Sequence, residues 1–346
     1  MTGIQKQVTN RTSKGQITKW TSNENGRLYL LKENGCTFVK QFGIETDTID
    51  FITTSNISEV IGYRIGRYLN IPTIPYHLVD SKQYPELNTK SQYLSKCQMI
   101  PYLNNMADFI EHLERTNVIS SLKIIELAIR GGVQPQRIYQ ILMFDALIGN
   151  EDRHLNNFNI NIKPDGRFAI DYILDNGNSL LYNVKTRDIP KLHLERPERI
   201  GPDKSKPLAD THDKQMKFIT RKLGQNKVVF NIHSNIETFM HFVETDPEIQ
   251  EAFRILNDKI KEQAIKYYLR NRYLKYVDGY VKPTYVLLDI KDKQYLVWNY
   301  STNTQQILKE AEIFNLLNRK IRIENLKIQT SNGKQYIQRK KTQITF

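Results

Sequence analysis

The feature that most constrains this chain is an abrupt change from apolar to polar residues near its middle. The stretch Pro135–Ile148 carries apolar residues at helical spacing, and Gly149 follows it as a stop signal. Ionisable and amide side chains then come at once, with Asp152 and Asn157 five residues apart. The pattern predicts an apolar helix followed by a loop whose side chains are suited to chemistry.

A hairpin is predicted directly after this loop. Two strand-like stretches, Phe158–Ile162 and residues 168–174, flank a turn sequence that reads Lys163-Pro164-Asp165-Gly166. The second stretch runs into Asp175. Because a hairpin brings its two ends together, we expect Asp175 to return close to Asn157.

These three polar side chains have the order that phosphoryl transfer requires. One carboxylate orients or deprotonates the attacking hydroxyl, while an amide oxygen and a second carboxylate hold Mg²⁺ against the phosphates. Mg²⁺ prefers a few hard oxygen ligands and keeps its remaining waters, so one Asp plus one Asn is a sensible pair. In protein kinases the base Asp precedes the metal Asn by five residues, and the metal Asp lies beyond a hairpin. Asp152, Asn157 and Asp175 therefore predict a kinase that uses ATP and Mg²⁺.

The same segment resembles the catalytic loop of HipA-like serine/threonine kinases, a group that includes CtkA-like bacterial kinases. Their pattern is G-N-x-D-R-H-x-x-N, and this chain reads Gly149-Asn150-Glu151-Asp152-Arg153-His154-Leu155-Asn156-Asn157. Their metal-binding segment, D-N-G-x-S-L, is similar to Asp175-Asn176-Gly177-Asn178-Ser179-Leu180. A further motif of the group resembles Ser205-Lys206-Pro207-Leu208, followed by Thr211-His212 and Gln215. The resemblance spans roughly residues 10–280, and the catalytic loop is its most specific part.

The resemblance implies roles for individual residues. By it, Asp152 is the catalytic base, Asn157 and Asp175 bind Mg²⁺, and Arg153 and His154 brace the loop. It also implies transfer of the γ-phosphate of ATP to a protein hydroxyl, with autophosphorylation at Thr12 or Ser13. The group includes toxins of toxin–antitoxin pairs and secreted bacterial effectors, so an antitoxin or inhibitor protein is an expected partner beside the protein substrate.

The order of elements predicts an α+β, bilobal protein-kinase-like fold with a small appended C-terminal α+β module. Residues 1–102 form the small β-rich N-lobe with one helix, residues 103–280 the larger helical catalytic C-lobe, and residues 281–346 the module. We expect the N-lobe strands at residues 16–22, Arg27–Lys32, 36–42, 75–79 and 93–100. Further helices are expected at Met106–Glu114, Ser121–Arg130, residues 246–276 and residues 303–318.

Fewer sequence signals support the predicted nucleotide contacts of the N-lobe. Ser13 and Gly15 belong to a polar stretch that is either a phosphate-covering loop or an ordinary turn. Lys40 is favoured over Lys32 as the phosphate lysine, because it precedes Glu59 by 19 residues, a typical separation for the lysine–glutamate pair.

Two further assignments belong to the same lobe. Glu59 has an alternative role as the third residue of a capping box that begins at Asn56. Backbone groups of a predicted hinge would contact adenine, and this hinge contains Met99 and Ile100 in the sequence Gln98-Met99-Ile100-Pro101-Tyr102.

Charge and composition limit the kinds of partner and the cellular compartment that are expected. Lys and Arg number 50 against 37 Asp and Glu, a net charge of +13, and residues 282–346 hold 12 basic and 5 acidic residues. The C-terminal module therefore either docks an anionic partner or presents a solvated basic surface. No secretory signal is visible, no apolar run approaches the roughly 18 residues of a membrane span, and there are two cysteines. We expect a cytoplasmic protein with no integral membrane segment, although secretion without a recognisable signal would leave no trace.

Other functions remain open from sequence alone. Phosphatidylinositol-type lipid kinases also carry D-R-H-x-x-N, although the segment Asp175-Asn176-Gly177 differs from the Asp-Phe-Gly typical of kinases. A small-molecule phosphotransferase is a further alternative. From a different class, the chain could be a pseudokinase or a nucleic-acid-binding module that uses its basic C-terminal part. The presence of all three catalytic-type side chains argues against a simple loss of catalysis.

Overall fold

The computed structural model describes most of the chain and divides it into two compact units, Met1–Asp278 and Gly279–Phe346. The described residues are 4–7, 18–41, 44–100, 104–115, 120–192, 203–223, 235–277, 285–292, 294–299, 304–318, 323–324, 326–331 and 334–339. None of the helices formed by these residues has the length and apolar character needed to cross a bilayer.

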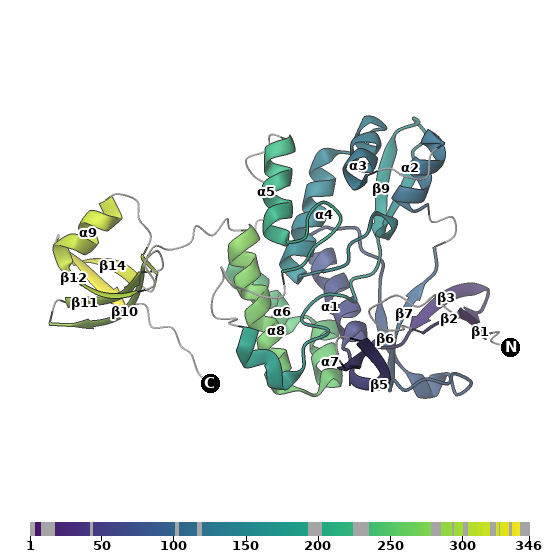
Figure 1. Cartoon of the computed structure of the whole chain (residues 1–346), viewed down its shortest axis with the longest axis horizontal. Coiled ribbons are helices and arrows are strands. Elements are labelled where there is room, and N and C mark those ends of the chain that lie inside the picture. Colours follow the sequence, from purple (N-terminus) through teal and green to yellow (C-terminus); the bar gives the residue numbers. More distant parts are fainter. Residues whose placement is uncertain are drawn as a thin grey trace. The chain divides into compact units, whose positions relative to one another are not determined.

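The first unit begins with a five-stranded antiparallel sheet (Figure 1). Its strand order is β1-β2-β3-β7-β6, formed by Ile4–Gln7, Lys19–Glu24, Arg27–Lys32, Tyr93–Gln98 and His77–Asp80. The prediction of Arg27–Lys32 is confirmed, and three other predicted strands are present with shifted ends. One face of the sheet is covered by a small apolar cluster that contains Trp20, Leu31 and Leu94. Because strand residues alternate between faces, Lys32 lies on the opposite face from Leu31.

A separate hairpin lies between β3 and the first helix in the chain. Strands β4 (Cys36–Gln41) and β5 (Ile44–Ile52) pair only with each other among the described residues. The predicted strand at residues 36–42 is therefore present, but it belongs to this hairpin and not to the five-stranded sheet. The strand β5 was not predicted.

Helix α1 (Ser55–Tyr68) connects the strands with the helical part of the unit. It contacts β6 and β7 on the strand side and α7 (Pro247–Leu256) on the helical side. Its N-cap is Thr54, whose side chain makes no capping bond, and Asn56 lies inside the helix with its amide donating to the Tyr93 carbonyl. The capping-box interpretation of Glu59 is therefore wrong, and Glu59 has another role.

The helical part is built around α4 (Pro135–Ile148), whose residues from Ile138 to Ile148 are all buried. The predictions for α2 (Met106–Glu114), α3 (Ser121–Arg130) and α4 are confirmed. Helices α5 (His212–Leu223) and α6 (Ile236–Thr245) precede α7 in the chain. The single long helix expected at residues 246–276 is wrong, because α7 ends at the left-handed Asn257 and Asp258 caps a new helix, α8 (Lys259–Arg272).

The second unit is a small α+β structure. A four-stranded sheet has the order β12-β11-β10-β13, formed by Thr304–Lys309, Gln294–Asn299, Tyr285–Lys291 and Ile323–Glu324. It is accompanied by helix α9 (Glu310–Asn318) and by the hairpin of β14 (Leu326–Ser331) and β15 (Lys334–Arg339). The helix expected at residues 303–318 is thus a strand in its first part, because β12 pairs with β11. The α+β fold class, with a β-rich first part and a helical second part, is confirmed.

The end of α4 gives a test of this packing. Gly149 has a φ of +67°, and a Cβ at this position would lie 1.9 Å from the Tyr268 hydroxyl oxygen. Gly166 has a similar φ of +80° but nothing within 4 Å of an added Cβ. We expect Gly166→Ala to lower the free energy of unfolding by about 1 kcal/mol, from backbone strain alone. Gly149→Ala adds a clash in the core and should cost about 3 kcal/mol or more. Denaturant unfolding of both variants measures the difference, and equal losses would contradict the packing at Tyr268.

Candidate active site

The loop after α4 is held by a fully buried arginine. The Nε and Nη2 atoms of Arg153 donate to the Asp145 carboxylate at 2.9 to 3.1 Å, and Nη2 also donates to Asn176 Oδ1 at 2.7 Å. Its Nη1 donates to the Leu174 carbonyl. Burial raises the pKa of the Asp145 carboxyl, and the adjacent guanidinium opposes this rise. Arg153 therefore ties the loop to α4 on one side and to residues 174–176 on the other.

A hairpin then brings the second carboxylate back to the loop, as the sequence predicts. Strands β8 (Phe158–Ile162) and β9 (Phe168–Ile173) pair in antiparallel fashion, and the Leu174 backbone N–H donates to the Asn157 carbonyl at 2.9 Å. Asn157 also donates through its side-chain amide to the Asp152 carbonyl at 3.4 Å. Since that amide nitrogen is used, the side-chain oxygen of Asn157 is left as its acceptor atom.

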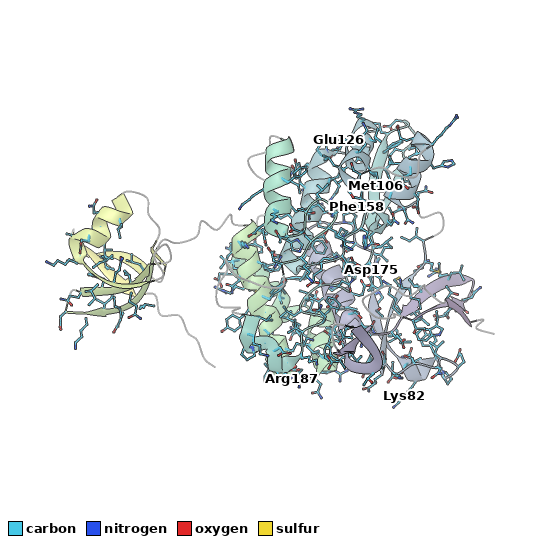
Figure 2. The ribbon with its side chains drawn as sticks, in the orientation of Figure 1. Lys82, Met106, Glu126, Phe158, Asp175 and Arg187 are labelled. Carbon is cyan, nitrogen blue, oxygen red and sulfur yellow. The ribbon has the colours of Figure 1, made fainter. Side chains whose placement is uncertain are left out.

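Asp175 lies where the strand-rich and the helical parts of the first unit meet (Figure 2). Its backbone has a φ of +61°, and its carbonyl accepts from the Asn150 side-chain amide at 3.2 Å. Its carboxylate oxygen Oδ1 lies 3.6 Å from Lys32 Nζ. Burial alone would raise the pKa of Asp175, but Lys32 and Lys19 outweigh it and hold this pKa well below the usual value. Asp175 is thus an ionised carboxylate, one residue after the Leu174 N–H that contacts the Asn157 carbonyl.

Lys32 also forms a buried ion pair with Glu59 of α1. The Nζ–Oε1 distance is 2.6 Å, and the other carboxylate oxygen of Glu59 accepts from the Asn176 backbone N–H at 2.8 Å. Burial would lower the pKa of Lys32, but Asp175 and Glu59 raise it well above the usual value. The pair therefore links the sheet, α1 and the segment that carries Asp175.

This pairing corrects the ranking of the two lysines. The sequence favours Lys40, which precedes Glu59 by 19 residues, whereas the lysine that contacts Glu59 precedes it by 27. The β4–β5 hairpin accounts for the longer separation, because it is inserted between β3 and α1. Lys40 lies on β4, and its side chain is outside the described residues.

A second lysine was missed by the sequence analysis. Lys19 on β2 is the cross-strand partner of Lys32, and its charge acts on Asp175. Burial lowers the pKa of Lys19, and the neighbouring Lys32 lowers it further. Two lysines of adjacent strands therefore face the same carboxylate, an arrangement that favours an anionic ligand between them. In the sequence, the only signal for a role of Lys19 is its position shortly after the polar stretch 12–16.

Asp152 is surrounded by three donors. Its Oδ1 lies 2.6 Å from Lys206 Nζ and 2.9 Å from His154 Nε2, and its Oδ2 accepts from Asn178 Nδ2 at 3.2 Å. Lys206 and Asn178 both lie in motifs quoted for the family resemblance, but no role followed from the sequence. His154, half-exposed, contacts the carboxylate directly, whereas Arg153 acts from the core.

Lys206 is presented by a compact turn at residues 203–212. The Ser205 N–H donates to the Asp210 carbonyl at 3.1 Å, and the Leu208 N–H donates to Gln215 Oε1 at 3.1 Å. At the end of the turn, His212 is fully buried and neither ring nitrogen has a hydrogen-bond partner among the described residues. Burial lowers the pKa of His212 well below its usual value, and Arg272 and Lys275 lower it further.

The remaining predicted contacts are only partly visible. Ser13 and Gly15, and Pro101 and Tyr102 of the hinge, are outside the described residues. The Met99 N–H donates to the Leu28 carbonyl at 2.8 Å, so the sheet already uses it, and this N–H is not available to adenine. Met99 and Ile100 also line a cavity that is described below.

The donor set fits Mg²⁺ better than a transition metal. Within the described ranges no three His, Cys, Asp or Glu side chains come together in a metal-binding group. An ionised carboxylate at Asp175 and an amide oxygen at Asn157 are the hard oxygen ligands that Mg²⁺ takes while keeping several waters. The chemistry of these two side chains therefore fits a magnesium site.

The Lys32–Glu59 pair can be tested through stability. Lys32→Met leaves the Glu59 carboxylate buried without its counter-charge, so we expect the free energy of unfolding to fall by about 3 kcal/mol or more. The double variant Lys32→Met/Glu59→Gln should recover part of this loss, since it removes the unpaired charge. Denaturant unfolding gives both values. Lys40→Met is the comparison, and an equal loss there would contradict the assignment of Lys32.

The buried His212 predicts a loss of stability in mild acid. Its folded-state pKa lies well below the value of 6.5 of the unfolded chain, so the unfolded state binds the proton more readily as the pH falls. The contribution of His212 to stability is complete above that value and declines below it. We expect a loss of about 1.4 kcal/mol between about pH 8 and pH 5.5 that is absent in His212→Gln. Denaturant unfolding at both pH values measures this loss of stability. If His212→Gln lost as much stability as the wild type, the assignment of the loss to His212 would be refuted.

Comparison with known proteins gives structural likeness only. No family model and no curated protein matches the sequence. Among solved structures, the chain is similar to the proinflammatory kinase CtkA of Helicobacter pylori, with 15% identity, a TM-score of 0.49, and coverage of 80% of this chain and 93% of that one. It also matches a spectinomycin phosphotransferase in complex with ADP and spectinomycin, with 9% identity, a TM-score of 0.22, and coverage of 76% and 88%.

The arrangement of these residues is similar to that in protein kinases. In protein kinases a lysine of the third strand pairs with a helix glutamate, and a catalytic loop meets a metal-binding Asp beyond a hairpin. Lys32 on β3, Glu59 on α1, and the convergence of Asp152, Asn157 and Asp175 reproduce these features. This chain has a kinase-like fold.

Proposed function

We propose that this protein is an ATP- and Mg²⁺-dependent serine/threonine protein kinase. The observation that carries the proposal is the convergence of Asp152, Asn157 and Asp175 beside a buried Lys32–Glu59 pair. Each of these groups alone has a structural explanation. Their combination matches the division of labour in phosphoryl transfer, in which catalysis is positioning and charge stabilisation.

Each residue has a role in this proposal. Asp152 orients the attacking hydroxyl and accepts its proton. Its carboxylate is held in position for this by Lys206, His154 and Asn178. Asn157 and Asp175 would hold Mg²⁺, which neutralises charge on the phosphates when it is bound. Lys32 contacts the phosphates, and Glu59 keeps it from turning toward solvent.

Lys206 adds a positive charge next to the base. Its Nζ lies 2.6 Å from Asp152 and 3.2 Å from His154 Nε2, and about two fifths of its side chain is exposed. A partly exposed ammonium in this position can contact both the base and a phosphoryl group in transit. The proposal therefore assigns Lys206 to stabilisation of the charge that develops during transfer.

Transfer of labelled phosphate from ATP tests these roles. We expect Asp152→Asn to lower the rate of transfer by about 10²-fold to 10⁴-fold, because the base is lost while the shape is kept. Lys206→Met should lower it by about 10²-fold. Lys204→Met is the matched control, since Lys204 is an exposed lysine of the same turn and Asp152 pairs with Lys206 instead. Binding of a fluorescent ATP analogue confirms that each variant still takes nucleotide.

The choice of acceptor separates the substrate classes. The wild type is offered a generic protein and, in parallel, phosphoinositide vesicles. Label on Ser or Thr of protein, lost in Asp152→Asn, supports the proposal. Label on lipid would replace the protein-kinase assignment by a lipid kinase with the same catalytic residues. Nucleotide binding without transfer to either acceptor would overturn the proposal in favour of a pseudokinase.

A further inference from the structure

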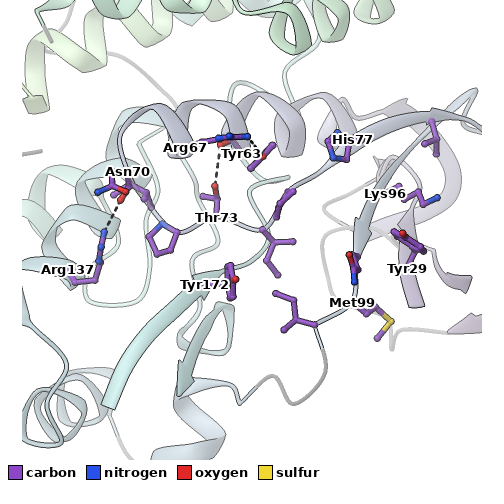
Figure 3. A pocket seen from close by; sticks show the side chains of 17 residues that line it. Tyr29, Tyr63, Arg67, Asn70, Thr73, His77, Lys96, Met99, Arg137 and Tyr172 are labelled. Carbon is purple, nitrogen blue, oxygen red and sulfur yellow. Dashed lines mark hydrogen bonds between the residues drawn. The ribbon is translucent and has the colours of Figure 1, made fainter. Parts of the chain in front are cut away.

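A cavity lies on the face of the sheet that points away from Lys32. It has a volume of about 960 Å³, within the range of ligand sites, and is lined in part by Tyr29, Lys96 and Gln98 (Figure 3). Tyr29 pairs across the strands with Gln98, and Lys96 pairs with Leu31. These residues share the face opposite to Lys32, because successive strand residues alternate between faces. We call this space the hinge cavity, since Met99 and Ile100 also line it.

The lining is cationic and contains no carboxylate. Arg67 of α1, Arg137 of α4, Lys96 and His77 contribute to it, and no Asp or Glu does. Two of these groups already have acidic partners outside the lining, because Lys96 contacts Glu24 at 2.5 Å and His77 Nδ1 lies 3.4 Å from Glu248.

The two arginines differ from the other cations. Arg67 contacts the Tyr63 hydroxyl at 3.3 Å, and Arg137 donates to the Asn70 carbonyl at 2.9 Å. Both partners are neutral, and no carboxylate pairs with either guanidinium among the described residues. Both line the cavity, and Figure 3 shows Arg137 beside Asn70 and Arg67 beside Tyr63. A guanidinium has five donors, so each keeps donors for an anion.

The rest of the cavity is aromatic and apolar. Tyr29, Tyr63 and Tyr172 line it, and Ile71, Pro72 and Ile74 add an apolar wall. Tyrosine rings and guanidinium planes both stack on aromatic groups. The geometry points to a second ligand site, in which the hinge cavity takes a small aromatic anion with its charge at Arg67 and Arg137.

The position of the cavity connects it to the candidate active site. Pro72 accepts from the Ile173 N–H at 2.7 Å, and the Ile74 N–H donates to the Ile173 carbonyl at 3.2 Å. Ile173 ends β9, two residues before Asp175, and α1 carries both Arg67 and Glu59. A bound ligand would therefore touch the elements that hold Asp175 and Glu59. Binding itself is independent of whether the protein is a kinase.

Two fluorescent probes test the site on the full chain. The first, 8-anilinonaphthalene-1-sulfonate, is an aromatic anion, and the second, N-phenyl-1-naphthylamine, is a neutral aromatic amine of similar size. We expect Arg67→Gln/Arg137→Gln to weaken binding of the sulfonate by about tenfold or more, because charge-assisted bonds are lost. Binding of the neutral probe should change little. Pro75→Trp, at an exposed lining position, reduces the volume and should weaken both probes.

The matched control removes the same charge elsewhere. Arg130 and Arg187 are exposed arginines outside the lining, so Arg130→Gln/Arg187→Gln should leave binding of the sulfonate unchanged. Thermal unfolding of each variant verifies that it is folded. An equal loss in the control pair would show that net charge governs binding and would overturn the proposal. No effect of the Arg67/Arg137 pair would overturn it as well.

Discussion

The candidate active site depends on the burial of Arg153. A charged group without exposed surface is costly unless it is paired and its remaining donors are satisfied. Arg153 meets this condition only when Asp145 of α4, the Leu174 carbonyl and Asn176 are all in place. Guanidinium geometry is planar and its charge is permanent, so the three partners are fixed in direction as well as distance. The loop and the segment after β9 are therefore positioned together by one side chain.

The charged side chains around Asp175 form a second constraint. Lys19 and Lys32 come from the sheet, Glu59 from α1, and Asp175 from the segment that Arg153 positions. Attraction between these opposite charges holds the sheet, α1 and the segment after β9 together, although the three are separated in the sequence. The same arrangement leaves Asp175 ionised, which is the state that a divalent cation requires. Structural and proposed chemical roles are thus served by one set of residues.

The sequence predicts local features of this site and misses the long-range ones. The loop at Asp152, the hairpin and the helix α4 depend on contiguous residues, and all three are present. The ranking of Lys40 above Lys32 is wrong because an inserted hairpin changes the spacing without changing the pairing. The break at Asn257–Asp258 was missed even though Asn and Asp are typical cap residues. Lys206 could not be assigned, because its contact with Asp152 spans 54 residues and depends on tertiary packing.

A second buried arginine explains how so distant a lysine can be held at Asp152. The last carbonyls of a helix lack partners within it and carry partial negative charge. At the end of α4, Ala146 accepts from Nε of the fully buried Arg272 of α8, and Ile148 accepts from the Leu180 N–H. Arg272 also contacts the Asp203 carboxylate at 3.5 Å, at the start of the turn that presents Lys206. The helix end that leads to the catalytic-type loop is therefore fastened by the same side chain that fastens the turn. Movement of α8 would displace Asp152 and Lys206 together, so the two are set by one packing arrangement.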